Sequence, residues 1–312
     1  MSIQEKFDVV VIGGGAAGIS AAIWCADLGM TAVILEKEDK LYGQLHSIHG
    51  PIRNYPGIVA RDGAELIGML ESSVGDWGIR SELMVSIEAV DCDAKTAKLS
   101  DGRVFTGRAM FIATGVRRRL LGVPGEAEFE GKGVLRSGAD EKDKVKGRRV
   151  VVVGGGDAAA ENALLLSEYA ERVLLVHRRS TLAARSEFQD RIAAAPNIEL
   201  ILDSEISEIG GTDNVEWVNI ISRDTGRDTR IETDHFIARI GVAPNSELLS
   251  PQLTTDSRGY IIVDHLCRTN ADDIFAIGDV ASPLSPTVPT AVGMGATAAK
   301  SALFLITALK NV

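Results

Sequence analysis

The sequence predicts an α/β protein made of two similar units, each a sheet covered by helices, with the second unit inserted into the first. Three observations lead to this prediction. A strand, a glycine turn and an alanine-rich helix occur near the N-terminus and again near the middle of the 312-residue chain. Each copy is followed by short segments typical of antiparallel strands. The C-terminal region then returns to a strand and a long helix.

The repeat consists of FDVVVIGGGAAGISAAIWCADLG, which begins at Phe7, and RRVVVVGGGDAAAENALLLSEYA, which begins at Arg148. In each copy, apolar β-branched residues predict a buried strand and the alanine-rich stretch predicts a helix. A further apolar strand follows each helix, at Thr31 and at Arg172. Because this β-α-β order occurs twice, we expect two Rossmann-like dinucleotide-binding domains.

The domain boundaries follow from the segments between and after the two copies. Residues 80–111 and 198–240 contain short strands and turn signals such as Asp101–Gly102. Each segment is interpreted as a small antiparallel layer, which gives every domain two layers of strands and one of helices. The strand at Ile274 and the helix after it return to the first domain. The expected boundaries are 1–117 and 242–312 for the first domain and 118–241 for the inserted one.

Composition excludes several classes of function. The formal net charge of −10 argues against general nucleic-acid binding. Three cysteines that are far apart, without a Cys-x-x-Cys pair, indicate a reducing compartment and no disulfide framework. No signal peptide is visible, and glycines interrupt the uncharged run 9–26, so we expect a cytoplasmic protein without a membrane segment. His46 and His49 have no neighbouring ligand residues, so no metal site is expected.

The first glycine turn, Gly13-x-Gly15-x-x-Gly18, lies between a predicted strand and a predicted helix. In that context the first glycine allows a tight turn, the second allows a diphosphate to approach the backbone, and the third allows helix and strand to pack closely. The free N–H groups of the helix N-terminus then face the phosphates. Glu36 ends the next strand and is placed to accept hydrogen bonds from an adenosine ribose.

The second turn, Gly154-x-Gly156-x-x-Ala159, is followed by a strand that ends in His177, Arg178 and Arg179 rather than in an acid. Two guanidinium groups pair with a 2′-phosphate, which a carboxylate would repel, and Arg185 is a candidate third donor. The second site is therefore expected to prefer NADPH to NADH. Two unlike dinucleotide sites in one chain indicate electron transfer, with a tightly held FAD in the first.

With these motifs in this order, the sequence resembles the low-molecular-weight thioredoxin reductase family of flavoproteins over essentially its whole length. Further matches are Gly43-Gln44-Leu45, Asn54-Tyr55-Pro56-Gly57, Ala113-Thr114-Gly115 and IFAIGDV, which carries Gly278 and Asp279. The resemblance implies FAD contacts from Gly13, Gly15, Ala16, Ala17, Gly18, Glu36, Gln44, Asn54, Val85, Thr114, Gly115, Gly278, Asp279, Thr290 and Ala291. It implies NADPH contacts from Gly154, Gly156, Asp157, Ala158, Ala159, His177, Arg178, Arg179, Arg185 and Gly241.

The resemblance also implies a homodimer whose two domains rotate against each other, so that nicotinamide and acceptor reach the flavin in turn. We expect the hinges near Val116–Leu120 and Gly241–Asn245.

The chain departs from the family at the redox-active site. Thioredoxin reductases carry a Cys-x-x-Cys followed by an acid before the second glycine turn, whereas here Ser137 and Asp140 occupy the cysteine positions and Glu141 the acid position. Without a thiol pair, ordinary disulfide exchange is not available, so we do not expect a thioredoxin reductase activity. Near the C-terminus, Val288-Pro289-Thr290-Ala291 replaces the family's Arg-Gln-Ala.

The sequence does not decide the identity of the electron acceptor. Relatives without the cysteines include ferredoxin–NADP reductases, and two basic clusters favour an acidic ferredoxin or flavodoxin as partner. The clusters are Lys142, Lys144, Lys146, Arg148 and Arg149, and Arg117, Arg118 and Arg119. One alternative is hydride transfer to a small molecule, with Asp140 or Glu141 as proton donor. Others are a reductase fed by a different donor and a flavin redox sensor that does not turn over.

Overall fold

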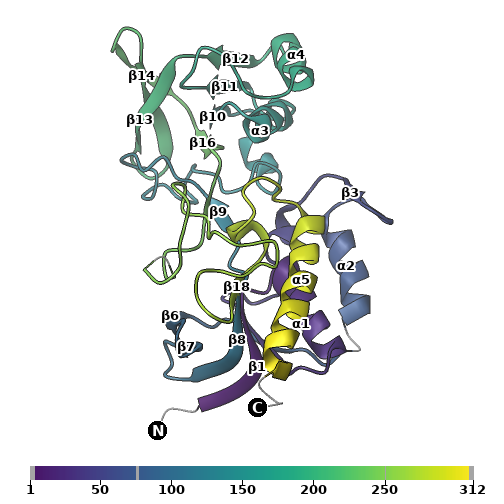
Figure 1. The fold of residues 1–312 in the computed structure, drawn as a ribbon. Helices are drawn as coiled ribbons and strands as arrows, with labels where there is room; N and C mark the ends of the chain where they lie inside the picture. Colours follow the sequence, from purple (N-terminus) through teal and green to yellow (C-terminus); the bar gives the residue numbers. More distant parts are fainter. Residues whose placement is uncertain (1–3, 75–76, 250, 309–312) are drawn as a thin grey trace. The chain divides into compact units, whose positions relative to one another are not determined.

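The computed structural model describes residues 4–74, 77–249 and 251–308, and the chain divides into two compact units. Unit 1 comprises Met1–Arg117 and Ala243–Val312, and unit 2 comprises Arg118–Val242 (Figure 1). Each unit has its own sheets, helices and buried core.

Unit 1 is built on a sheet that has seven strands within the described residues, in the order β5-β2-β1-β8-β7-β6, with β18 also paired to β8. The parallel strands are β1 (Gln4–Ile12), β2 (Ala32–Leu35), β5 (Arg80–Glu82), β8 (Val104–Ile112) and β18 (Ile274–Ala276). The antiparallel ribbon is β6 (Ile87–Asp91) and β7 (Thr96–Leu99). The carboxyl ends of the parallel strands meet at one edge of the sheet.

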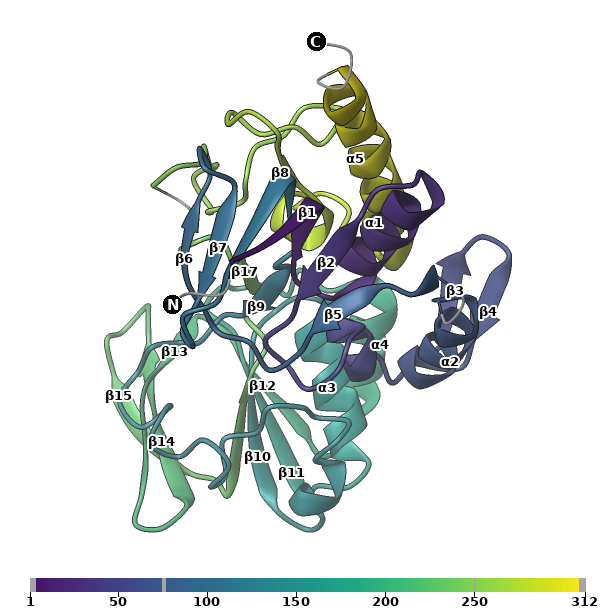
Figure 2. The same ribbon diagram turned by 90° about the horizontal axis from the view of Figure 1, so that it is seen from below.

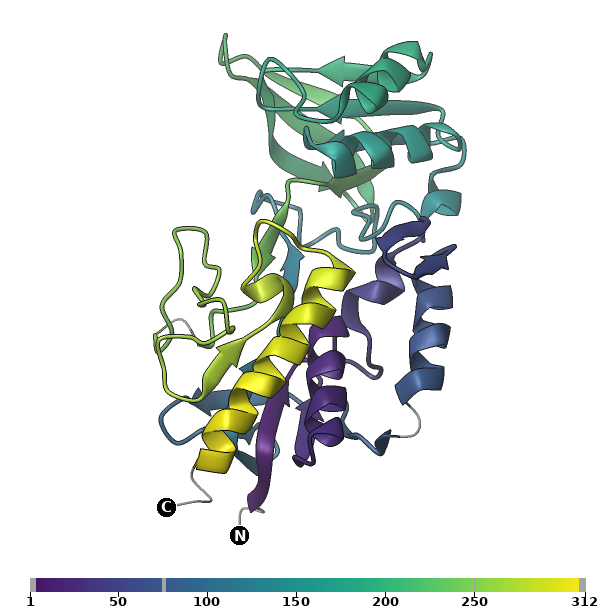
Figure 3. The same cartoon turned by 45° about the vertical axis from the view of Figure 1, so that its right-hand side comes forward.

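The alternating side chains of β1 fill two cores, as the period of two in a strand requires. Val9 and Val11 are buried with α1 (Ala16–Asp27) and α5 (Val288–Ala308), whereas Val10 and Ile12 are buried with the β6–β7 ribbon on the other face. Figure 3 shows α5 lying along α1. The two helices approach closely at Gly295, which has no side chain. A Cβ at this position would lie only 2.6 Å from the Ala17 carbonyl oxygen.

The remaining elements of unit 1 lie between β2 and β5 and after β18. They are η1 (Gly43–Ser47), β3 (Ile52–Tyr55), β4 (Ile58–Ala60), α2 (Gly63–Val74) and η4 (Gly278–Val280).

Among the described residues, only the segment Val288–Thr307 of α5 has the length and composition of a membrane-crossing helix. Ala298, Ala299 and Ala302 of this helix are fully buried in the unit 1 core with α1. Packing within the protein therefore accounts for the apolar character of these positions of α5.

Unit 2 has a parallel sheet in the order β12-β11-β10-β16. Its strands are β10 (Arg149–Val153), β11 (Arg172–Val176), β12 (Ile198–Ile201) and β16 (His235–Ala238), and its helices are η3 (Lys142–Val145), α3 (Asp157–Ser167) and α4 (Ser186–Ala194). A separate antiparallel sheet contains β13 (Ser204–Gly211), β14 (Val215–Ser222) and β15 (Asp228–Glu232).

The alternation seen in unit 1 recurs in β10. Val150 and Val152 pack with α3 and α4, and Val151 and Val153 pack with β13 and β14. Unit 2 is thus a helical layer, a parallel sheet and an antiparallel sheet, which Figure 2 shows in the order α3, β10–β11 and β13–β15.

The chain passes between the units twice. The two crossing segments, β9 (Val116–Arg118) and β17 (Val242–Pro244), pair with each other as a two-stranded sheet. The hinges predicted from the family resemblance fall on these segments and stay a prediction.

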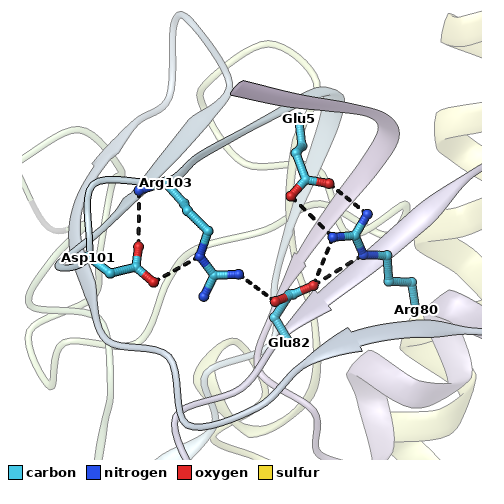
Figure 4. Close-up of polar contacts among 5 residues, drawn as sticks. All are labelled: Glu5, Arg80, Glu82, Asp101 and Arg103. Atoms are coloured by element: carbon cyan, nitrogen blue, oxygen red, sulfur yellow. Dashed lines mark hydrogen bonds and ion pairs between the residues drawn. The ribbon is translucent and has the colours of Figure 1, made fainter. Parts of the chain in front are cut away.

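A network of five charged side chains fixes the edge of the unit 1 sheet (Figure 4). Glu82, the last residue of β5, accepts hydrogen bonds from Arg80 at 2.9 Å and from Arg103 at 2.5 Å. Arg80 also pairs with Glu5 at 2.6 Å, and Arg103 with Asp101 at 2.8 Å. The two guanidinium groups hold the pKa of Glu82 below its usual value, with the hydrogen bond from Arg103 as the larger cause.

We expect Glu82→Gln to lower the melting temperature of the protein by about 2–4 °C at pH 7, which corresponds to about 1 kcal/mol for a partly exposed network. A carboxyl group with a lowered pKa stabilises the folded state above its unfolded pKa of about 4.3, and this stabilisation is lost as the pH falls through the folded pKa. The difference between variant and wild type should therefore shrink as the pH falls below about 4.3 and disappear once the pH is below the lowered pKa of folded Glu82.

Thermal unfolding across this pH range provides the measurement. Glu88→Gln is the matched control, because Glu88 forms an isolated pair with Lys98 in which both side chains are about half exposed. Equal losses in the two variants would contradict a special role for the network.

Candidate dinucleotide sites

In the glycine turn of unit 1, backbone segments lie closer together than a residue with a Cβ atom would allow. Gly13 has a φ of +105°, and a Cβ there would lie 2.4 Å from the Ala113 carbonyl oxygen. A Cβ at Gly18 would lie 2.0 Å from the carbonyl oxygen of Gly13. At Gly15 the Cβ position has no other atom within 4 Å, so this side of the turn is open.

Helix α1 begins directly after this turn. Its N-cap is Gly15, and no side chain caps it. The first N–H groups of the helix, from Ala16, Ala17 and Gly18, thus have no intrahelical acceptor and are suited to bind phosphate oxygens. An open glycine beside an uncapped helix N-terminus fits a dinucleotide diphosphate.

Glu36 is held rigidly beside the turn. Its side chain is buried, with 6% exposed. One carboxylate oxygen accepts the Gly14 N–H at 2.6 Å and the other accepts the Glu38 N–H at 2.9 Å. The Glu36 backbone pairs with Glu82 and Val85. Each carboxylate oxygen keeps a lone pair for a ribose hydroxyl. Val85, which was predicted to contact FAD, thus donates its backbone N–H to the Glu36 carbonyl oxygen.

Three further predicted FAD residues, Gln44, Thr114 and Gly115, lie at or beside the end of β8. The Gln44 side chain donates to the Val116 carbonyl at 3.1 Å, and a Cβ at Gly115 would lie 3.8 Å from the Gln44 amide nitrogen. Thr114 exchanges two hydrogen bonds with Asn245, at 2.7 and 2.8 Å. Asn54, by contrast, lies exposed on β3.

The Gly278–Asp279 pair lies against the start of α1. Gly278 has a φ of +71°, and a Cβ there would lie 2.8 Å from the Ala17 Cβ and 3.8 Å from the Ala291 Cβ. Burial raises the pKa of Asp279, and within the described residues no group donates a hydrogen bond to its carboxylate. A half-buried carboxylate without a donor fits a ligand that supplies hydroxyl groups.

Thr290, at the start of α5, is bonded within its own loop. Its hydroxyl lies 3.0 Å from the hydroxyls of Ser285 and Thr287.

The glycine turn of unit 2 has the same geometry. Gly154 has a φ of +146°, and a Cβ there would lie 2.3 Å from the Arg239 carbonyl oxygen and 2.8 Å from the Ala159 Cβ. Gly156 is open and is the N-cap of α3, again without a side-chain cap. The N–H groups of Asp157 and Ala158 lie in the first turn of this helix, and that of Ala159 donates to the Gly156 carbonyl at 3.0 Å.

The His177 imidazole covers the middle of this turn, because a Cβ at Gly155 would lie 2.2 Å from its Cε1 atom. Its Nε2 atom is buried and has no hydrogen-bond partner among the described residues. Burial, together with Arg179 and Arg178, lowers the pKa of His177. The ring is therefore neutral near pH 7 and packs against Gly155.

Arg178 and Arg179 differ from Arg185 in their environment. Both are exposed at the end of β11, and neither guanidinium forms an ion pair within the described part of the chain. Arg185 instead donates to the Asp157 carboxylate from its N–H and its Nε, both at 2.8 Å, and lies 4.8 Å from the Phe188 ring centroid. Arg185 thus already has an anionic partner in the protein. Gly241, with a φ of +97°, follows β16.

The segment that replaces the redox cysteines is a capped turn. The Glu141 carboxylate accepts the N–H groups of Arg136 and Ser137 at 2.7 and 2.9 Å, and the Lys144 ammonium at 2.9 Å. Burial alone would raise the pKa of Glu141, but these hydrogen bonds hold it below its usual value. A lowered pKa is the opposite of what a proton donor needs. Asp140 is exposed, and its N–H donates to the Ser137 hydroxyl.

The basic clusters are partly neutralised. Arg149 pairs with Asp234 and Glu232, Lys144 with Glu141, and Arg117 with Glu247. Lys142 lies 5.5 Å from the Tyr169 ring centroid. Lys146 and Arg148 form no ion pair among the described residues. Lys144 and Arg148 line a cleft of about 510 Å³ in unit 2, next to His235 at the start of β16.

The three cysteines are buried, with 0% of Cys25, 2% of Cys92 and 4% of Cys267 exposed. Burial raises the pKa of Cys25 to about 12 and that of Cys267 to about 11, and it also raises the pKa of Cys92. Within the described residues no group of His, Cys, Asp and Glu side chains is suited to hold a metal ion.

We expect no thiol of the native protein to react rapidly with a chromogenic disulfide reagent at pH 8, because the thiolate is the reactive form and all three thiol pKa values are raised. All three should react after unfolding in guanidinium chloride, which serves as the control. A burst of one or two thiols from the native protein within seconds would contradict this.

Comparison with known proteins agrees with this geometry. A family model described as pyridine nucleotide-disulphide oxidoreductase matches residues 7–295. The chain is 33% identical to a thioredoxin reductase of Peptoclostridium acidaminophilum over 308 residues, covering 96% of this chain and 97% of that protein. It is 32% identical over 301 residues to a 34.2 kDa protein in the rubredoxin operon of Clostridium pasteurianum, with the same coverage.

Among solved structures, Lactococcus lactis thioredoxin reductase superposes with a TM-score of 0.85 and 32% identity, covering 96% of this chain and 99% of that one. This likeness confirms the predicted α/β fold with two Rossmann-like domains and the predicted resemblance to thioredoxin reductases. On these matches, the chain belongs to the pyridine nucleotide-disulphide oxidoreductase family, with relatives of the thioredoxin reductase type.

Proposed function

We propose that the protein is an FAD-dependent NADPH oxidoreductase without a redox-active disulfide, which passes electrons from NADPH through the flavin to a small acidic carrier protein of the ferredoxin or flavodoxin type. The observation that carries this proposal is the turn Ser137–Glu141. It occupies the place of the family's cysteine pair and contains a hydroxyl and carboxylates, while the three thiols of the chain are buried elsewhere. A homodimer in the cytoplasm is part of the same proposal.

In unit 1 we assign FAD to the Gly13 turn. Glu36 would accept the adenosine ribose hydroxyls, the α1 N-terminus would hold the diphosphate, and Asp279 would accept from hydroxyl groups farther along the cofactor. Bound FAD would accept an electron pair from the reduced nicotinamide and would pass single electrons to a carrier. The open Gly15 and the unsatisfied Asp279 support this assignment.

In unit 2 we assign NADPH to the Gly154 turn. The two unpaired guanidinium groups of Arg178 and Arg179 support a 2′-phosphate, since each gains an anionic partner when the nucleotide binds. Arg185 contributes less to this recognition than the sequence alone indicates, because Asp157 already holds it.

Two observations favour a protein carrier over a small-molecule acceptor. One relative is a rubredoxin-operon protein. The other observation is the unit 2 cleft, whose lining includes Arg148 beside Lys144 and Asp234. Arg148 has no ion-pair partner among the described residues, and its charge would attract an acidic carrier. Hydride transfer to a small molecule would need a proton donor, and Glu141 has a lowered pKa. That leaves the exposed Asp140 as donor in this second candidate function.

We expect the double variant Arg178→Ala, Arg179→Ala to lower kcat/KM for flavin reduction by NADPH about ten- to a hundredfold, because two charge-assisted hydrogen bonds are lost. Reduction by NADH should change less than about twofold, since NADH has no 2′-phosphate. Stopped-flow absorbance of the flavin gives both rates. Arg172→Ala is the control, since Arg172 lies at the opposite end of β11 in an exposed pair with Glu199. Equal losses with both nucleotides would contradict the assignment.

We expect Arg148→Glu to slow reoxidation of the reduced flavin by ferredoxin about tenfold at low ionic strength, and to leave flavin reduction by NADPH unchanged. The difference should shrink at about 0.5 M salt, where charges are screened. Lys98→Glu in unit 1, which reverses an exposed charge paired with Glu88, is the control. Reoxidation by thioredoxin or a disulfide, but not by ferredoxin or flavodoxin, would contradict the proposal.

A further inference from the structure

Arg239 of unit 2 lies beside the glycine turn but was not among the residues that the sequence pointed to. It directly follows β16, and its N–H donates to the Val153 carbonyl at 2.7 Å. Its own carbonyl oxygen is the atom that a Cβ at Gly154 would meet at 2.3 Å. Arg239 thus belongs to the same edge of the sheet as the turn.

The strand order tells which half of a bound nucleotide Arg239 would face. The sheet runs β11-β10-β16, and dinucleotides lie across the carboxyl ends of such strands. The adenosine half belongs to the end of β11, at Arg178 and Arg179, and the diphosphate belongs to the turn after β10. The nicotinamide half then lies toward the end of β16, where Arg239 is. This step rests on the proposed NADPH site.

The charge of Arg239 is poorly compensated. Its guanidinium donates to the carbonyls of Ala238 at 2.8 Å and Arg136 at 3.3 Å, and it forms no ion pair with any described residue. Arg118 donates to the same Arg136 carbonyl, so two guanidinium groups converge on one oxygen. Burial and then Arg118 lower the pKa of Arg239 to about 10.

Glu141 opposes these effects on Arg239, and Asp140 acts in the same sense on the neighbouring Arg118. The oxygens of Glu141 already accept from Arg136, Ser137 and Lys144. Arg118, Arg239 and Lys144 thus face the two carboxylates of Asp140 and Glu141, which leaves a net positive charge near the end of β16.

We propose that Arg239 makes unit 2 discriminate between the two redox states of the nucleotide, binding the reduced form more tightly than the oxidised form. The oxidised nicotinamide ring carries a positive charge and the reduced ring is neutral, whereas all phosphates are common to both. A guanidinium beside this half repels only the oxidised ring. Its attraction to the phosphates cancels in the ratio of the two affinities, which therefore reports the ring charge alone.

The test compares two nucleotides that cannot react with the oxidised holoenzyme: NADP⁺ and tetrahydro-NADP, whose saturated ring is neutral and gives up no hydride. Calorimetric titration measures both dissociation constants, and adenosine 2′,5′-bisphosphate reports the adenosine half alone. Wild type should bind tetrahydro-NADP about three- to tenfold more tightly than NADP⁺, the size expected for two unit charges about 10 Å apart with partial screening.

Arg239→Met should bring this ratio close to one, because the repulsion of the oxidised ring is lost, while Arg239→Lys, which keeps the charge, should retain it. Arg172→Met is the matched control and should leave the ratio unchanged. The bisphosphate should bind wild type and Arg239→Met equally, which also shows that unit 2 is folded in the variant.

Equal weakening of both dinucleotides in Arg239→Met would overturn the proposal, because it indicates a phosphate or structural contact. An unchanged ratio would overturn it as well. If wild type binds none of the three ligands, the NADPH assignment fails and the role of Arg239 fails with it. If wild type binds the ligands but the variants do not change the ratio, only the role of Arg239 is ruled out and the NADPH assignment stands.

Discussion

The close backbone contact at each glycine turn is the constraint on which both sites depend. In unit 1 a Cβ at Gly18 would lie 2.0 Å from the Gly13 carbonyl oxygen, and in unit 2 a Cβ at Gly154 would lie 2.3 Å from the Arg239 carbonyl oxygen. These contacts let each helix begin directly at the carboxyl end of a central strand. Since neither helix has a side-chain cap, their first N–H groups remain available to an anion. The surrounding strands and cores serve to hold these two turns.

The two turns share geometry but differ in charge, and this difference divides their roles. Glu36 places a buried carboxylate at the first turn, which suits ribose hydroxyls and disfavours a 2′-phosphate. The second turn is bordered by Arg178 and Arg179 on one side and by Arg239 on the other. These three guanidinium groups form no ion pair with any described residue, which in a chain of net charge −10 supports the proposed anionic ligand. The proposed pairing of FAD with NADPH follows from this asymmetry.

The sequence predicted the features that depend on neighbouring residues. Strand periodicity, the glycine spacing and the repeat led to the fold class, which the structural comparison confirms. The residues that the sequence missed depend on contacts between distant segments. Arg239 meets Gly154 only when β16 pairs with β10, and the network from Glu5 to Asp101 forms only in the folded sheet. The sequence also did not predict that Asp157 neutralises Arg185 or that Glu141 caps its turn, because the type of a residue does not show which group it will contact.

If FAD is the redox centre of the protein and no disulfide takes part, as we propose, the number of electrons consumed on full reduction will show it. The oxidised protein is titrated anaerobically with dithionite while the flavin absorbance is followed. About one two-electron equivalent per flavin should complete the bleaching, because no disulfide shares the electrons. A requirement for about two equivalents would reveal a second redox centre such as a disulfide and would contradict the account.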